Sequence, residues 1–136
     1  MLWLTIITFL FYSLNVTGFK IKNFVLVDGS CIKTEPIDLA FWIPYCAAVI
    51  IFYFKPDIGQ WILLCLYLLG IVVLSLNTFK YTIFPNERKV KGYNKCFEKT
   101  HHIIKPSDKR LVPDTFHITL YILLNINLVS IILFIK

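Results

Sequence analysis

Charged side chains are scarce in this chain. Lysine, arginine, aspartate and glutamate together make up 16% of its 136 residues, whereas an average soluble domain has about 25%. Apolar residues make up 57% of the chain, and the mean hydropathy is +0.70. This composition excludes a disordered chain, which needs high charge and few apolar residues, and it excludes an ordinary soluble enzyme. It indicates a protein that lies in a membrane.

Cysteine motifs are lacking as well. The four cysteines, Cys31, Cys46, Cys65 and Cys96, include no Cys-x-x-Cys pair, so the sequence predicts neither a zinc ribbon nor a thioredoxin-type redox site. Cys46 and Cys65 fall in apolar segments, where a thiol packs as a small apolar group. Cys31 and Cys96 fall in loops that the charge distribution assigns to the reducing cytoplasm, and we therefore expect no disulfide. The chain also has no internal repeat.

The apolar residues form four segments, each close to the roughly 20 residues that a membrane-spanning helix needs. These segments cover residues 2–19, 37–54, 58–79 and 115–135. Only Lys55-Pro56-Asp57 separates the second segment from the third, so these two helices must be antiparallel neighbours. The predicted fold is an all-α integral membrane protein, in which residues 1–136 form one polytopic domain with a four-transmembrane-helix bundle.

The first segment resembles a secretion signal in length but not in its flanks. No lysine or arginine precedes the apolar residues, and Asn15-Val16-Thr17-Gly18 is a poor cleavage site. We therefore expect this segment to be retained as a membrane helix. Cleavage and a re-entrant segment are the alternatives.

Basic residues determine the predicted orientation in the cell membrane. The two long loops, residues 20–36 and 80–114, hold 12 of the 14 lysines and arginines, and Lys55 and Lys136 are the other two. Because lysine and arginine close to the membrane resist translocation, both loops are predicted to be cytoplasmic. Four crossings then place both termini outside.

The first cytoplasmic loop has the pattern of a short β-hairpin. Residues 23–27 and 30–34 are rich in β-formers, and Asp28-Gly29 between them is a strong signal for a two-residue turn. We predict a small hairpin at the membrane surface.

The second cytoplasmic loop is long and basic. It carries nine cations and four acidic residues, a net charge of +5, which favours binding to anionic lipid headgroups. Its prolines and glycine predict an extended or turn-rich loop with one helical turn around residues 93–102. No nucleic-acid-binding module is present, so we expect no nucleic-acid partner.

Polar residues within the apolar segments are expected to face other helices. In the first segment these residues are Thr5, Thr8, Tyr12 and Asn15. In the fourth, a stripe within an arc of about 80° comprises Asp114, His117, Tyr121, Asn125 and Leu128. We expect this stripe to face the bundle interior, with Asn125 bonded to other helices and Asp114 capping the helix. The alternative is that the stripe lines a polar cavity in which His117 is functional.

The sharpest candidate site combines two acid-x-x-His pairs, Glu98 with His101 and Asp114 with His117. On a helix this spacing puts carboxylate and imidazole on the same face, and the two groups suit zinc, iron or manganese. The candidate metal ligands are Glu98, His101, His102, Asp114 and His117. Two alternatives remain: a basic loop with incidental histidines, and a Cys96–His101 nucleophile pair oriented by Asp108 or Asp114.

Two classes of function follow. The first is a non-enzymatic accessory or partner-binding membrane component, whose partner is another protein or a second copy of the chain. This class is favoured because nearly all of the chain is used in spanning the membrane. The second is a membrane-embedded protein or enzyme that depends on a divalent transition metal.

Overall fold

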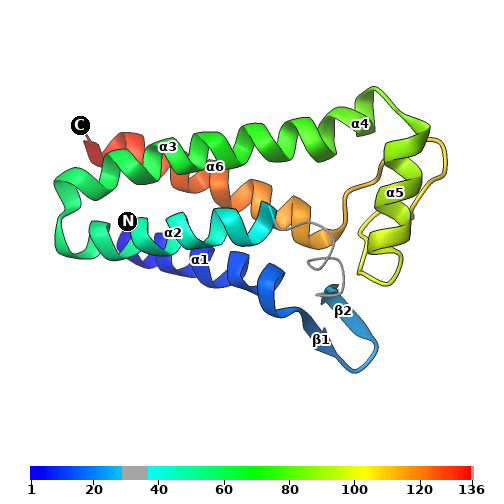
Figure 1. Cartoon of the computed structure of the whole chain (residues 1–136), viewed down its shortest axis with the longest axis horizontal. Coiled ribbons are helices and arrows are strands. Elements are labelled where there is room, and N and C mark those ends of the chain that lie inside the picture. Colours follow the sequence, from blue (N-terminus) through cyan, green and yellow to red (C-terminus); the bar gives the residue numbers. More distant parts are fainter. Residues whose placement is uncertain (29–36, 136) are drawn as a thin grey trace.

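Four long helices lie side by side in a computed structural model of the chain, which describes residues 1–28 and 37–135 (Figure 1). They are α1 (Leu2–Thr17), α2 (Ile37–Phe54), α3 (Pro56–Leu74) and α6 (Thr115–Ile135). Neighbouring contacts run from α1 to α2, to α3, to α6 and back to α1. Both termini and the α2–α3 turn lie at one end of these helices, and the two long connections lie at the other end. We call the four helices the bundle.

The head is the part of the molecule at the far end of the bundle from the termini. It contains two strands, β1 (Phe19–Ile21) and β2 (Phe24–Val27), the helix α5 (Glu87–Phe97), and the segment 98–114. A π-helix, η2 (Ser75–Phe79), and α4 (Lys80–Ile83) extend α3 towards the head.

The helix boundaries agree closely with the apolar segments of the sequence. The segments 37–54 and 115–135 are helical over the same residues as predicted. The third helix is longer than predicted, because α3, η2 and α4 form one rod over Pro56–Ile83. The first ends two residues early, because Gly18 has a φ of 74° and turns the chain out of α1.

Within residues 1–28 and 37–135, two helices and not four are long and apolar enough by themselves to cross a membrane. The Pro56–Ile83 rod has 28 residues and α6 has 21, which correspond to about 42 Å and 32 Å against a hydrocarbon core of about 30 Å. The 16 residues of α1 reach only about 24 Å, and the apolar part of α2, Leu39–Phe54, is similarly short. The structure therefore supports two full-length membrane-spanning helices, rather than the four that were predicted. Long apolar helices also occur in the cores of soluble proteins. The distribution of polar and apolar side chains between the inside and the outside of the bundle is therefore the better indication of its surroundings.

A close approach of backbones confirms that α2 and α3 are antiparallel neighbours. The chain reverses at Lys55, whose N–H bonds to the Ile51 oxygen at 2.7 Å. A Cβ atom added to Gly59 would lie 2.2 Å from the Cα of Phe52. Only glycine allows the two helices to touch at this point.

The head contains a β-hairpin, but its strands are paired differently from the prediction. Strand β2 falls within the predicted strand 23–27, and it pairs antiparallel with β1, which directly follows α1. Lys22, with a φ of 51°, and Asn23 make the turn between them. Asp28-Gly29 is therefore not the turn of this hairpin. The predicted second strand, residues 30–34, lies outside the described residues.

Helix α5 corrects the prediction of an extended loop with one helical turn at residues 93–102. It begins after Asn86, whose side chain accepts the N–H of Lys89 at 3.2 Å as an N-cap. It is amphipathic, and Val90 on its apolar face is fully buried. The helix ends at Phe97, before both histidines of the predicted turn.

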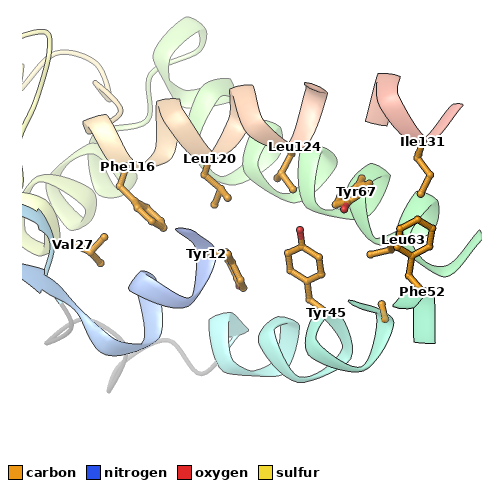
Figure 2. Close-up of a cluster of buried hydrophobic side chains, with 11 residues drawn as sticks. Tyr12, Val27, Tyr45, Phe52, Leu63, Tyr67, Phe116, Leu120, Leu124 and Ile131 are labelled. Atoms are coloured by element: carbon orange, nitrogen blue, oxygen red, sulfur yellow. The ribbon is translucent and has the colours of Figure 1, made fainter. Parts of the chain in front are cut away.

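The bundle interior combines aromatic rings with polar groups from α1 (Figure 2). As predicted, α1 buries Thr5, Thr8, Tyr12 and Asn15. The hydroxyl of Tyr67 donates to Thr5 Oγ1 at 3.2 Å, and the amide of Asn127 donates to Thr8 Oγ1 at 2.7 Å. These bonds tie α1 to α3 and to α6.

The buried face of α6 is not the predicted one. It consists of Phe116, Leu120, Leu124, Asn127 and Ile131. The amide of Asn125 instead donates to the Tyr121 oxygen of its own helix at 2.7 Å. Asn125 and Asn127 are about 200° apart around the helix, so only one of them can face α1, and Asn127 is the one that meets Thr8.

The cysteines divide into two groups. Cys46 and Cys65 are free thiols, in agreement with the prediction. Cys96 is disulfide-bonded, so the expectation of no disulfide was wrong. Cys31 lies outside the described residues.

Candidate functional site at the junction of the head and the bundle

A buried carboxylate marks the point where the head meets α6. Asp114 is only 1% exposed and follows Pro113, which fixes the approach to the helix. Its Oδ1 accepts the backbone N–H of His117 at 2.9 Å, which makes Asp114 the N-cap of α6 as predicted.

The same carboxylate holds the imidazole of His117. The distance between Asp114 Oδ1 and His117 Nδ1 is 2.6 Å, so the acid-x-x-His spacing brings these two side chains together as expected. The hydroxyl of Thr100 reaches Oδ2 at 3.0 Å and the Phe97 oxygen at 2.8 Å. We call Tyr93, Thr100, Asp114 and His117 the junction network.

Tyr93 completes the junction network from α5. Its hydroxyl accepts the backbone N–H of Asp114 at 3.1 Å and lies 3.3 Å from His117 Nδ1. The rings of Tyr93, Phe97 and Phe116 surround the imidazole with centroid distances of 5.0 to 5.7 Å. The imidazole is therefore held in place on its ring faces as well as through Nδ1.

The junction network favours a negative charge on Asp114. Burial by itself raises the pKa of this carboxyl, but the hydrogen bonds from His117 and Thr100 and the charge of His117 outweigh burial, and the pKa is lowered. At Tyr93, burial and then the nearby Asp114 charge raise the pKa of the hydroxyl, which stays protonated. The junction network therefore holds Asp114 as an anion whose two carboxylate oxygens both accept hydrogen bonds.

The other candidate metal ligands are not part of the junction network. Glu98 is exposed beyond the end of α5, so the Glu98–His101 pair does not lie on a helix. His101 Nδ1 lies 2.7 Å from Thr115 Oγ1, and His102 Nδ1 donates to the Thr100 oxygen at 2.8 Å. Across residues 1–28 and 37–135, no three His, Cys, Asp or Glu side chains gather as a metal site would need.

His101 instead joins three parts of the molecule. Its backbone N–H bonds to the Val25 oxygen at 2.7 Å, and its oxygen accepts the Thr115 N–H at 2.9 Å. Its ring packs on Phe24 with a centroid distance of 4.9 Å. Together with Glu98 and His102 it also lines a surface pocket of about 330 Å³. His101 thus links the hairpin to the start of α6.

A second cavity, of about 100 Å³, lies inside the bundle beside the junction network. His117 lines it, together with Asn15 of α1, Tyr45 of α2 and Gly70 of α3. Within the described residues, the Tyr45 hydroxyl is buried and has no hydrogen-bond partner. The imidazole that Asp114 orients therefore borders an apolar space that contains an unpaired donor.

Sequence reasoning missed three residues of this region. Thr100 lies next to the candidate ligand His101, but no spacing rule connects it to Asp114, fourteen residues away. Tyr93 belongs to α5, of which only a single turn from residue 93 onwards was predicted. Tyr45 could not be distinguished in the sequence from the other aromatic residues of the apolar segments. The neighbouring Pro44, inside α2, was the only local feature that marked this position.

The chain has no match among protein-family models, curated proteins or solved structures. Its function therefore has to be argued from the geometry.

Proposed function

We propose that this chain is a small multi-pass integral membrane protein with four helices in the bilayer, and that it serves as a non-enzymatic accessory or partner-binding component. One observation carries the proposal: the bundle has its polar groups inside and its large apolar side chains outside.

Every helix of the bundle exposes large apolar side chains along its outer face. They include Trp3, Ile7 and Leu10 on α1, Ile43 and Ile50 on α2, Leu68, Leu69 and Val72 on α3, and Ile122, Ile126 and Val129 on α6. A soluble bundle would place charged residues at such positions. Apolar surface this extensive indicates contact with lipid or with another protein.

The interior of the bundle shows the complementary pattern. Thr5, Thr8 and Asn127 are completely buried, and each of them takes part in a hydrogen bond between helices. Small polar residues at helix interfaces are typical of membrane bundles, in which lipid offers polar groups no partner. Because α1 and α2 share this pattern with the longer helices, we place all four in the bilayer. A local thinning of the bilayer accommodates the shorter two.

A lysine scan at two exposed isoleucines tests the membrane location. Ile126 is 46% exposed on α6, and Ile103 is 64% exposed in the head. In a bilayer, Ile126→Lys costs roughly 2.5 to 3.5 kcal/mol at the helix centre, and we expect the variant to be largely lost from membranes after alkaline extraction. Ile103→Lys should behave as the parent does. Equal recovery of both variants in the membrane fraction would contradict the proposal, because at a water-exposed site both changes are harmless.

The junction network supports a non-enzymatic role. Both oxygens of Asp114 are engaged, by Thr100 on one side and by the start of α6 and His117 on the other. This use of the carboxylate holds the head on the bundle, and it leaves the metal-dependent alternative with a single acid–imidazole pair.

Two observations concern the orientation of the head, and they disagree. The excess of basic residues in the two loops predicts a cytoplasmic head. The disulfide at Cys96 requires an oxidising compartment. The charge rule is a bias with exceptions, whereas a thiol in a reducing compartment is kept reduced. We therefore propose that the head faces an oxidising compartment and that the termini are cytoplasmic, the reverse of the charge-based prediction.

We also propose that the head rests on anionic lipid headgroups. Helix α5 buries Val90 and exposes Arg88, Lys89, Lys91 and Lys95. Each cation near an anionic surface contributes about 1 kcal/mol. Replacement of Lys89 and Lys91 by alanine should make the head more sensitive to protease in vesicles of phosphatidylglycerol but not in vesicles of phosphatidylcholine. Equal protease sensitivity in both vesicles would contradict a headgroup contact.

A further inference from the structure

We propose that the cavity inside the bundle binds a small, uncharged ring molecule that carries one hydroxyl or carbonyl oxygen. The cavity lies where α1, α2, α3 and α6 meet, and its walls include Tyr12, Phe41, Tyr45, Phe116 and Leu124. This inference goes beyond the proposed function, because the same cavity would bind the same ligand whether or not the bundle lies in a membrane.

The size and the lining of the cavity select a single ring. Its volume is about 100 Å³, which is smaller than the apolar cavity of about 150 Å³ that binds benzene in another protein, so the ligand is no larger than one unsubstituted or minimally substituted ring. Aromatic rings make up much of the wall, and they favour a flat ring that can pack on their faces or edges. The ionisable group in the wall, His117, is already paired with Asp114, so a charged ligand would lose its hydration without gaining a free counter-ion, and the ligand is uncharged.

The Tyr45 hydroxyl selects the polar atom of the ligand. Tyr45 is 2% exposed, and Figure 2 shows its hydroxyl pointing from α2 into the space between α3 and α6. Its ring packs edge-on against Tyr67 with a centroid distance of 5.9 Å. Within the described residues its hydroxyl makes no hydrogen bond of 3.5 Å or less, and the polar group with which it interacts at longer range is the Tyr67 hydroxyl. A buried polar group without a partner costs about 1 to 3 kcal/mol, and a ligand oxygen would remove that cost.

Gly70 lines the cavity at a cost in helix stability. Glycine inside a helix costs about 1 kcal/mol relative to alanine, and Gly70 lies in the middle of α3. A Cβ atom there would lie 3.3 Å from Leu124 Cδ1 and 3.5 Å from Phe41 Cζ. A larger side chain at position 70 would therefore project towards two residues of the cavity wall and reduce the space between them.

Two probes of nearly the same shape separate the ring from its oxygen. Benzene and phenol differ by one hydroxyl group, and each can be titrated calorimetrically into the full chain in detergent, with a blank titration into detergent alone. We expect phenol to bind roughly two- to tenfold more tightly than benzene, the range for one net hydrogen bond.

Two variants with a matched control assign the binding to the cavity. Tyr45→Phe should remove the advantage of phenol and leave benzene binding unchanged. Tyr53→Phe, at a residue that is 63% exposed, should change neither affinity. Gly70→Val should weaken both probes at least tenfold, because it fills the cavity. Helicity by circular dichroism verifies that each variant is folded.

Three outcomes would overturn the proposal. The first is equal affinity of the two probes for the parent chain, because the Tyr45 hydroxyl would then play no part. The second is binding that Gly70→Val leaves unchanged, which places the probes elsewhere. The third is no binding of either probe at millimolar concentration, as expected if water fills the cavity and pairs with Tyr45. If Tyr45→Phe does not fold, the parent and Gly70→Val titrations still decide the question.

Discussion

Two asparagines of α6, two positions apart, have opposite environments. The side chain of Asn127 is fully buried, and its amide reaches Thr8 on α1 at 2.7 Å and the Leu123 oxygen at 2.9 Å. Asn125 bonds only within its own helix. The difference between them is a hydrogen bond between helices, and substitution can measure it.

Asn127→Leu should lower the stability of the bundle more than Asn125→Leu does. The first change removes the bond to Thr8, for which measured values in membrane proteins are about 0.6 to 1.7 kcal/mol. The second removes a bond within one helix and should cost close to nothing. Unfolding midpoints in detergent measure both effects, and a larger loss for Asn125→Leu would mean that the faces of α6 are assigned the wrong way round.

Asp114 should make the stability of the protein depend on pH in the acidic range. Its pKa in the folded state is lower than the ordinary aspartate value of 3.8, so its contribution is fully present above about pH 4 and is lost as the pH falls through the folded-state value. Asp114→Asn should lower the unfolding midpoint near pH 6 and flatten its dependence below pH 4. The exposed Asp108 offers a control, because Asp108→Asn should leave both unchanged. Parallel acid titrations of the parent and Asp114→Asn would contradict this role.

At the scale of elements, the fold depends on how closely α2 and α3 approach. Their crossing is set by Gly59, where any side chain would overlap the Phe52 backbone. Gly92 in α5 is the opposite case, because a Cβ atom there meets nothing within 4 Å. Both glycines are helical, so their different surroundings separate packing from helix propensity.

Gly59→Ala should be destabilising and Gly92→Ala stabilising. The first forces the helices apart, and overpacking of this kind costs about 1 to 3 kcal/mol. The second gains about 0.5 to 1 kcal/mol of helix stability. Thermal midpoints of the two variants should shift in opposite directions. A neutral Gly59→Ala would mean that α2 and α3 are not in backbone contact.

For the whole molecule, thiol labelling can test on which side of the membrane the head lies. In a variant with Cys46→Ser and Cys65→Ser, neither bundle thiol can react with a thiol reagent. We expect intact cells to be labelled by a membrane-impermeant thiol reagent only after treatment with an impermeant reductant, because Cys96 is held in a disulfide on the oxidising side. Labelling that needs cell lysis but no reductant would place the head in the cytoplasm, as the charge distribution predicted.

Local patterns in the sequence determined the long elements of this protein. The lengths of the apolar segments located all four bundle helices, because a continuous apolar segment of this length is most stable as a helix whose backbone groups pair within it. The three-residue connection at Lys55 made α2 and α3 antiparallel. The spacing in α1 gave its buried face, and Pro113-Asp114 gave the N-cap of α6 and the contact of Asp114 with His117.

Contacts between residues far apart in the sequence determined the buried face of α6, the junction network and the cavity. The sequence could not choose between Asn125 and Asn127, because both fit helical spacing and only the position of Thr8 on α1 distinguishes them. It could not bring Tyr93 and Thr100 to Asp114, because they come from α5 and from a non-helical segment. The sequence could not predict the cavity beside Tyr45 either, because residues of four different helices form its walls. Hydrogen bonds and packing of this kind depend on three-dimensional neighbours, and no local spacing encodes them.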